Sequence, residues 1–352
     1  MSALDQSPGR TATIDGKEHL FFSGYSYLGM SHVTEFVELV KEGIDKYGTL
    51  FPSSRISNTR LRIFEPMEAL LSQLTSQEET VIYSSGFLAG RAVVDLLFKI
   101  NAKCFAAPGT HAAVGITAEQ LIGDWQQRFI DLTEKTAHDE YVLLTDSLNP
   151  LTAAINDFSF LINISSNKKI TCVIDDSHGV GLLGEKGEGI SSLLPKLSNI
   201  EYILTYSLSK AFHTNGGAIS CSKRFSVLLR QSPFYTASTS VSPSLCYAFI
   251  KGQNLYSKQR KKLQQNSTSF QESVCQIQHI SFHPQLPVFI LTNEFDQDYF
   301  TPHNIIISSF PYPNPSGKKI NRIVLNTLHT KEDMEAIASV VEKKNGGQPL
   351  SS

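Results

Sequence analysis

The segment Ile174-Asp175-Asp176-Ser177-His178-Gly179 decides the fold. It starts at the end of the apolar run Thr171–Ile174, which has the length and composition of a buried strand. Two acids and a histidine therefore stand at the carboxyl end of that strand, where open α/β sheets bind their ligands. A second run, Tyr202–Thr205, ends in the polar segment Ser207-Leu208-Ser209-Lys210. Polar groups after successive strands predict a ligand site at one edge of a parallel sheet.

Strand-like and helix-like segments alternate around this point. Predicted strands are Glu79–Tyr83, Lys103–Ala106, Phe129–Leu132, Tyr141–Thr145, Thr171–Ile174, Tyr202–Thr205 and Gly217–Cys221, and predicted helices are Thr34–Tyr47, a segment from Arg62 and Leu88–Ile100. This pattern is typical of an α/β domain with a mostly parallel sheet covered on both faces. Later come long polar helices, the strands Val288–Thr292, Ile305–Ile307 and Arg322–Leu325, and a final helix, Glu332–Lys344. These elements predict a smaller α+β domain.

The chain of 352 residues is long enough for two domains. We expect an N-terminal arm and helix over 1–49, a large domain over 50–235 and a small C-terminal α+β domain over 236–352.

Composition excludes several classes of function. The 31 basic and 33 acidic residues give a net charge of −2, so nucleic acid is not an expected partner. The longest apolar runs are far too short to span a membrane. The five cysteines are scattered without a C-x-x-C pair, which argues against a metal site, and the N-terminus has no secretory pattern. We therefore expect a cytoplasmic protein without a bound metal.

Gly179-Val180-Gly181-Leu182-Leu183-Gly184 has the glycine spacing of a dinucleotide-binding turn. Such a turn must lead straight into a helix, but Gly187 and Gly189 follow, and each would weaken a helix by about 1 kcal/mol. The acids Asp175 and Asp176 also precede the glycines instead of following them. A nicotinamide site is therefore disfavoured.

A lysine among small hydroxyl residues fits a different cofactor. Lys210 can form a Schiff base, and the neighbouring hydroxyls can bind a phosphate. An acid on the preceding strand can keep a pyridine nitrogen protonated. These are the groups that pyridoxal 5'-phosphate requires.

Six segments, in order along nearly the whole chain, resemble segments of the α-oxoamine synthases, which are fold-type I pyridoxal-phosphate enzymes. They are Phe22–Gly29, Ser53–Thr59, Ser85–Phe87, Asp175–Gly179, Ser207–Lys210 and Ser238–Pro243. The resemblance implies a large domain with a mostly parallel seven-stranded sheet flanked by helices, and a smaller C-terminal α+β domain.

The resemblance also implies roles for the matching residues. Lys210 matches the Schiff-base lysine, and Asp175 matches the carboxylate on the pyridine nitrogen. His178 matches a donor to the cofactor's phenolic oxygen, and His111 matches a ring that stacks on the cofactor.

Further matches concern the phosphate and the neighbouring subunit. The phosphate-binding matches are Ser85, Gly86, Phe87 and Ser207, and an acid and a serine near the ring are matched by Asp146 and Ser147. Ser238 and Thr239 match donors that reach the phosphate of the neighbouring subunit. The resemblance thus implies a homodimer with active sites shared across the interface.

The departures from the family pattern lie on the substrate side. Tyr25 or Ser26 stands in place of an asparagine, and Phe64 in place of a histidine. The arginine that the family places near residues 308–311 to hold the substrate carboxylate is absent. Arg322 and Arg55 are the candidate replacements, because a guanidinium fork suits a carboxylate.

The implied reaction condenses an amino acid with an acyl thioester, carried by coenzyme A or by an acyl carrier protein, with loss of carbon dioxide. We expect alanine and a pimeloyl thioester, a pair that belongs to biotin biosynthesis. A glycine- or serine-using synthase, a fold-type I aminotransferase and a non-catalytic subunit are the alternatives.

Overall fold

The computed structural model describes residues 3–100, 102–115, 118–135, 140–149, 151–312 and 315–345. The chain separates into two compact units. The larger unit comprises Glu35–Leu148 and Ile155–Asn254, and the smaller one comprises Met1–Thr34, Asn149–Ala154 and Leu255–Ser352. Residues 35–49 and 236–254 thus belong to the larger unit in this division. The domain boundaries expected at 49/50 and 235/236 stay a prediction.

A seven-stranded sheet forms the centre of the larger unit. Its order is β3 (Glu79–Tyr83), β11 (Gly217–Cys221), β10 (Ile200–Ser207), β9 (Lys169–Asp175), β6 (Glu140–Asp146), β4 (Cys104–Ala106) and β5 (Glu119–Gln120). Only β11 runs antiparallel to its neighbours. The predicted mostly parallel sheet is confirmed, and the carboxyl ends of the six parallel strands lie at one edge.

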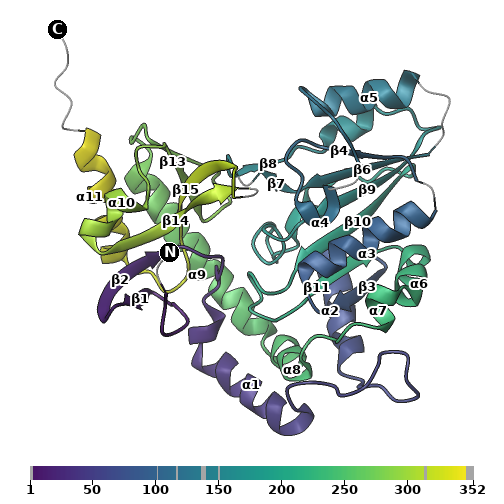
Figure 1. Cartoon of the computed structure of the whole chain (residues 1–352), viewed down its shortest axis with the longest axis horizontal. Coiled ribbons are helices and arrows are strands. Elements are labelled where there is room, and N and C mark those ends of the chain that lie inside the picture. The colour runs from purple at the N-terminus through teal and green to yellow at the C-terminus, as the bar shows by residue number, and fades with distance from the viewer. Residues whose placement is uncertain are drawn as a thin grey trace. The chain divides into compact units, whose positions relative to one another are not determined.

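Helices surround this sheet (Figure 1). They are α2 (Phe64–Thr75), α3 (Gly86–Lys99), α4 (Ala112–Gly115), α5 (Trp125–Lys135), α6 (Lys223–Gln231) and α7 (Pro233–Thr236). Most of α1 (Thr34–Tyr47) and all of α8 (Pro243–Lys251) also belong to the larger unit. The side chain of Ser85 caps α3 by accepting a hydrogen bond from the Leu88 N–H at 3.1 Å. Ala89, Val93 and Leu97 then recur at helical spacing and are buried in the core with the strands.

The prediction of a strand over Phe129–Leu132 is wrong, because these residues lie inside α5. Phe129 is fully buried and Thr133 follows it one helical turn later, so the buried face has helical period. A short apolar run does not distinguish a strand from a buried turn of helix.

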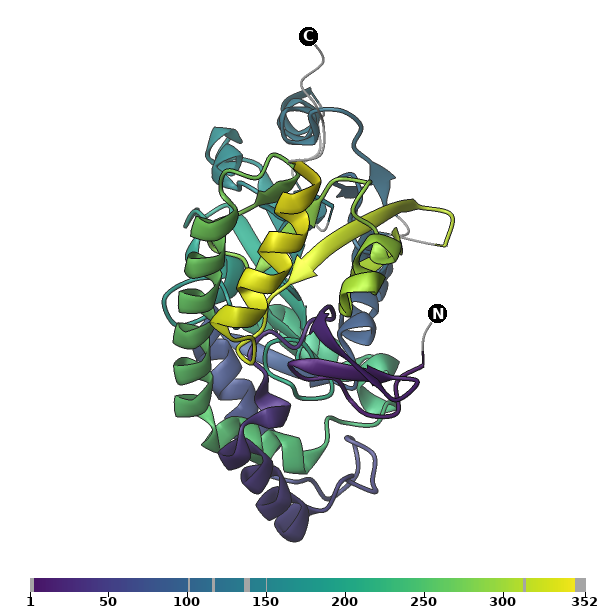
Figure 2. The ribbon, with the colours of Figure 1, turned by 90° about the vertical axis from the view of Figure 1, so that its left-hand side faces the viewer.

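The smaller unit contains a six-stranded sheet. Its order is β1 (Thr11–Ile14), β2 (Lys17–Phe22), β14 (Ile305–Tyr312), β15 (Lys318–Val324), β13 (Val288–Leu291) and β12 (Ile280–Phe282). The N-terminal hairpin β1–β2, which turns at Asp15-Gly16, thus extends the C-terminal sheet. Helix α11 (Lys331–Asn345) lies on one face of the strands (Figures 1 and 2). Most of α9 (Gln253–Val274), together with α10 (Gln297–Phe300), completes the unit.

The described part of the chain has neither a helix suited to a membrane nor a cluster suited to a metal ion. No helix there combines the length and the apolarity needed to cross a bilayer. Among the same residues, no group of three or more His, Cys, Asp or Glu side chains is placed to hold a metal ion.

Candidate active site

Four strand ends place the candidate site at the carboxyl edge of the seven-stranded sheet. Asp175 is the last residue of β9, Asp146 of β6 and Ser207 of β10, while Ser85 follows β3 closely. Asp146 pairs directly with Asp175 in the ladder between β6 and β9. Because these strands run parallel, their polar ends gather at one place, as the sequence predicted.

The side chains of Asp175 and His111 are neighbours. His111 Nδ1 is 3.6 Å from Asp175 Oδ2, and the histidine side chain is 43% exposed against 10% for the aspartate. Asp175 Oδ1 accepts a hydrogen bond from the Ser177 N–H at 3.0 Å. The Ala113 N–H donates to His111 Nδ1 at 3.3 Å. The result is a largely buried carboxylate next to a half-exposed imidazole.

Asp146 holds the backbone of His111. Its two carboxylate oxygens each accept from the His111 N–H at 3.1 Å. Burial raises the pKa of Asp146 well above its usual value, and the charge of Asp175 raises it further. The His111 N–H and the positive charge of Lys210 oppose this shift. The carboxyl groups of Asp146 and Asp175 thus interact, and Lys210 is close enough to influence Asp146.

Asp176 is fully buried, unlike its neighbour Asp175. Its Oδ2 accepts from the Ile190 N–H at 2.9 Å, and a methyl group added at either Gly179 or Gly189 would overlap its carboxylate oxygens. Burial raises the pKa of Asp176 to about 7, although the Ser147 hydroxyl and the Ile190 N–H lower it. Gly179 of the glycine pattern that resembled a dinucleotide motif, together with Gly189, therefore packs against this acid.

The start of α3 packs against the ends of two strands. We term this group the α3 cradle: Ser85, Gly86 and Phe87 at the start of α3, Ser207 at the end of β10 and Gly217 at the start of β11. A Cβ on Gly217 would overlap the Gly86 backbone, and one on Gly86 would lie 2.9 Å from the Ser207 Cα and Cβ. Such close approach brings the first turn of α3 against the backbone and Cβ of Ser207. The first N–H groups of a helix have no partner within the helix and suit an anion.

Two hydrogen bonds fix the position of Ser207. Its N–H donates to Ser177 Oγ at 3.0 Å, which joins the ends of β9 and β10. Its hydroxyl lies 2.8 Å from Ser209 Oγ. Phe87 is 52% exposed, and Ser85 is also exposed.

The remaining residues predicted on the larger unit lie in turns and loops. Lys210 is half-buried in the turn after β10, where its carbonyl accepts from the His213 N–H at 3.3 Å. His178 is half-buried in the turn after β9. Ser147 is buried beside Asp176. Ser238 and Thr239 follow α7, and the Ser238 hydroxyl donates to the Phe234 carbonyl.

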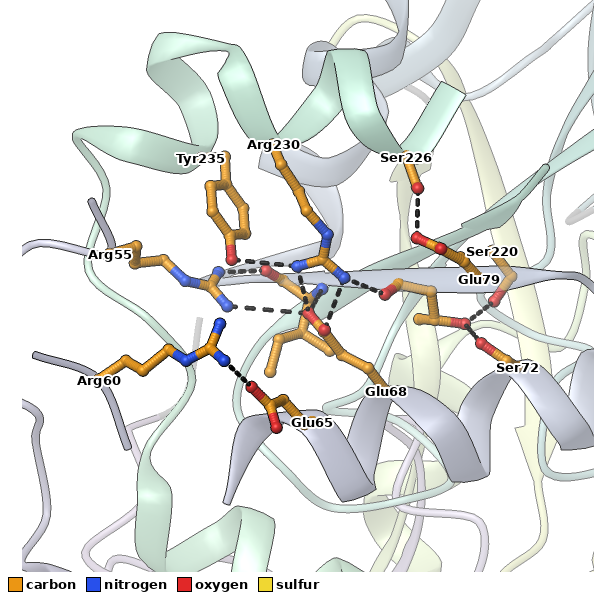
Figure 3. A network of polar contacts seen from close by, with 12 residues as sticks. Arg55, Arg60, Glu65, Glu68, Ser72, Glu79, Ser220, Ser226, Arg230 and Tyr235 are labelled. Carbon is orange, nitrogen blue, oxygen red and sulfur yellow. Dashed lines mark hydrogen bonds and ion pairs between the residues drawn. The ribbon is translucent and has the colours of Figure 1, made fainter. Parts of the chain in front are cut away.

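Arg55 lies in a buried polar network (Figure 3). Its side chain is 4% exposed, donates to the Ile82 carbonyl and lies 3.9 Å from Glu68 Oε1. Its Cζ sits 4.0 Å from the centre of the Tyr235 ring. These contacts occupy the guanidinium that we considered as a substrate cation.

The other predicted substrate residues belong to the smaller unit. Arg322 lies on β15 opposite Ser308, with its Cζ 5.8 Å from the centre of the Phe310 ring and its Nε buried without a hydrogen-bond partner in the described structure. Tyr25 is 50% exposed and Ser26 is half-buried. Ser26 accepts from the Gly29 N–H through its carbonyl.

Sequence reasoning missed two features. It assigned no role to Asp176, although the glycines at 179 and 189 were the available signal. It also missed Glu68 and Arg230, which bind each other at 2.7 Å and come from segments far apart in the sequence. Nothing in a single sequence joins them.

Comparison with known proteins gives consistent relationships. The model of a family described as aminotransferase class I and II matches residues 59–341. The 8-amino-7-oxononanoate synthase of Lysinibacillus sphaericus is 24% identical over 349 residues, covering 94% of this chain and 90% of that protein. The corresponding synthase of Petrotoga mobilis is 27% identical over 364 residues, covering 97% and 92%.

Solved structures agree on the architecture. A serine palmitoyltransferase from S. paucimobilis, with a bound pyridoxal-phosphate–myriocin aldimine, has a TM-score of 0.84 at 16% identity and covers 98% of this chain and 92% of its own. An 8-amino-7-oxononanoate synthase from Francisella tularensis has a TM-score of 0.72 at 22% identity, covering 93% and 98%. The predicted fold-type I architecture is therefore confirmed.

Proposed function

The chain belongs to the aminotransferase class I and II family, and we propose that within it the protein is a pyridoxal-phosphate-dependent C-acyltransferase of the α-oxoamine synthase type. It would condense an amino acid with an acyl thioester, releasing carbon dioxide and the free thiol. The first candidate is 8-amino-7-oxononanoate synthase, acting on alanine and a pimeloyl thioester, as the names of the relatives suggest. The observation that carries the proposal is the meeting of Asp175, His111 and the α3 cradle at one sheet edge.

The residues at this edge fit pyridoxal phosphate. A phosphate group matches the α3 cradle, because helix N–H groups and a serine hydroxyl can donate to an anion, and the two glycines let the segments that carry these donors approach each other closely. A protonated pyridine nitrogen matches Asp175, and an aromatic ring face matches His111. When bound, the cofactor accepts the electron pair left on the Cα of the amino acid.

The side chains of the site then have distinct tasks. Lys210 would hold the cofactor and carry the Cα proton, which requires an amine that can be deprotonated. Asp175 would accept the pyridine N–H, and His178 would donate to the phenolic oxygen. His111 would cover one face of the ring and exclude water from it. Asp146 would keep His111 in place through its backbone N–H.

On the substrate side we propose Arg322 as the carboxylate-binding cation, with Tyr25 and Ser26 near the substrate. The buried, unpartnered Nε of Arg322 supports this assignment, since a buried donor without an acceptor is costly. Arg55 is not assigned this role, because Ile82, Glu68 and Tyr235 already occupy its guanidinium.

We also propose a homodimer in the cytoplasm, in which Ser238 and Thr239 bind the phosphate of the neighbouring subunit. The five cysteines, all within the described residues, are unpaired, which supports a reducing compartment.

Substitution of Lys210 tests the cofactor assignment. After borohydride reduction and denaturation, the wild-type protein with pyridoxal phosphate is expected to keep an absorbance band of the cofactor covalently attached to the chain, and Lys210→Ala is expected to lack this attached band. The exposed Lys196→Ala is a control that should keep the band. A wild-type protein without the band, or an unchanged band in Lys210→Ala, would overturn the assignment.

Substrates are identified on the same protein by adding alanine, glycine or serine with an acyl thioester and measuring thiol release. Release with alanine and a pimeloyl thioester supports the first candidate. Release with glycine or serine identifies the alternative synthases. Amino-group transfer to a keto acid without thiol release would instead identify an aminotransferase.

A further inference from the structure

Two arginines, one glutamate and one tyrosine form a cluster beside β3, which we term the Glu68 cluster: Arg55, Glu68, Arg230 and Tyr235. Glu68 lies on α2 and is 7% exposed. Its Oε2 accepts from Arg230 Nη2 at 2.7 Å, and its Oε1 lies 3.9 Å from Arg55 Nη2. The single carboxylate thus faces two guanidinium groups (Figure 3).

Both arginines of the cluster contact Tyr235. The Arg55 guanidinium lies over the ring, with Cζ 4.0 Å from its centre, while Arg230 Nη1 donates to the tyrosine hydroxyl at 3.1 Å. A cation over an aromatic face is stabilising, and more so where water is excluded. Tyr83 adds an edge contact, with ring centres 6.1 Å apart. Tyr235 belongs to α7, a helix of four residues that has little stability of its own.

Two further hydrogen bonds connect α7 to the segments before and after it. Ser54, next to Arg55, donates its hydroxyl to the Thr236 carbonyl at 2.9 Å. The Ser238 hydroxyl donates to the Phe234 carbonyl, also in α7. The position of α7 therefore sets the position of Ser238 and, next to it, Thr239.

The same cluster also forms hydrogen bonds with the backbone of β3. Arg55 donates to the Ile82 carbonyl, and Glu68 Oε1 accepts from the Ile82 N–H at 3.1 Å. Arg230 Nη2 donates to the Thr80 carbonyl at 3.1 Å. Ile82 lies just before Ser85, so this strand leads directly into the α3 cradle.

From these contacts we infer that Arg55 is a positioning residue for the cofactor phosphate, acting through the Glu68 cluster on both phosphate-binding segments, Ser85–Phe87 and Ser238–Thr239. The inference rests on the proposed function. In the proposed homodimer, Ser85–Phe87 bind the phosphate of their own subunit and Ser238–Thr239 bind that of the neighbouring subunit. The cluster would therefore connect the active site of its own subunit with that of the neighbour.

The test is the dissociation constant of pyridoxal phosphate, measured by equilibrium dialysis of Arg55→Ala and Arg55→Lys holoenzymes. Alanine removes all the contacts of Arg55, and lysine keeps the charge but lacks the planar guanidinium with its several N–H donors. Both variants are therefore expected to bind the cofactor at least about tenfold more weakly. Excess pyridoxal phosphate should restore activity, and at saturation the KM for the amino acid should stay within about twofold of wild type. Should Arg55→Ala fail to fold, the lysine variant carries the test.

Conservative changes at Tyr235 separate positioning from general destabilisation. Tyr235→Phe keeps the ring beneath Arg55 and should bind the cofactor more tightly than Tyr235→Leu, which removes it. Arg60→Ala is the matched control, since Arg60 in the same loop makes an exposed ion pair with Glu65. Arg10→Ala removes the ion pair with Asp333 in the smaller unit and controls for lost stability.

The outcomes are distinct from failure of the proposed function. A wild-type protein that binds no pyridoxal phosphate would refute the proposed function itself. Where the wild type binds it, unchanged cofactor affinity in both Arg55 variants overturns the inference. So does a raised KM for the amino acid with normal cofactor affinity, which would make Arg55 the substrate cation instead.

Discussion

Asp175 and Asp176 are adjacent in the chain but lie in different surroundings. Asp175 faces the half-exposed His111 ring, whereas Asp176 is enclosed by Gly179, Gly189 and the Ile190 N–H. The place of Asp175 at the end of a strand was predictable, because the apolar run before it has the pattern of a buried strand. The packing of Asp176 was not, because it depends on how the loop after residue 179 folds back.

The pH dependence of stability tests the buried state of Asp176. Its folded pKa of about 7 lies above its usual value of 3.8, so between these values the folded protein binds more protons than the unfolded chain. Ionisation of this carboxyl group therefore lowers the free energy of unfolding as the pH rises from about 4 to about 7 and above. Asp176→Asn removes the titration and keeps the shape, so its unfolding temperature should fall less than that of wild type from about pH 5 to about pH 8.

Thermal unfolding of both proteins, saturated with pyridoxal phosphate, measures this difference. Asp5→Asn, at an exposed position, is the control and should follow the wild-type curve. Parallel curves for Asp176→Asn and wild type would show that Asp176 does not titrate in this range.

At the scale of elements, prediction succeeded where a pattern was long or was bounded by turns. The strand ending at Asp175 and the helix after the Ser85 turn were both predicted. The apolar run Phe129–Leu132 was too short to decide between strand and helix, and tertiary packing made it helical. The pairing of the N-terminal hairpin with β14 is a long-range contact that local sequence does not encode.

The approach of β11 to α3 gives a prediction at this scale. In Gly217→Ala the new methyl would overlap the Gly86 backbone and push the first turn of α3 away from Ser207. The dissociation constant of pyridoxal phosphate should rise by about tenfold or more. Gly43→Ala is the control, because its methyl would crowd the Ser244 backbone of the same unit, away from the α3 cradle. Both variants should lose stability, and equal cofactor affinities would refute the role of the cradle.

At the scale of the whole molecule, the sequence predicted the fold class, and it predicted the meeting of the candidate cofactor residues at one sheet edge better than it predicted the surroundings of the substrate candidates. The cofactor segments follow strands of one sheet, so their meeting follows from parallel topology. The substrate candidates Arg322, Tyr25 and Ser26 belong to the smaller unit, formed from distant parts of the chain. The arginine motif at residue 55 was recognised, but its burial against Glu68 and Tyr235 depends on tertiary contacts.

The proposed shared active site predicts complementation between two inactive proteins. Lys210→Ala lacks the lysine of its own site, and a Ser238→Ala, Thr239→Ala double variant lacks the donors for its neighbour's site. In a mixed dimer both defects fall on one site, which leaves the other site intact. Random mixing by co-expression should therefore restore about a quarter of wild-type activity per subunit. If Ser238 and Thr239 serve their own subunit, every site carries one defect and mixing restores nothing, so thiol release by the mixture against the separate variants decides between the two arrangements.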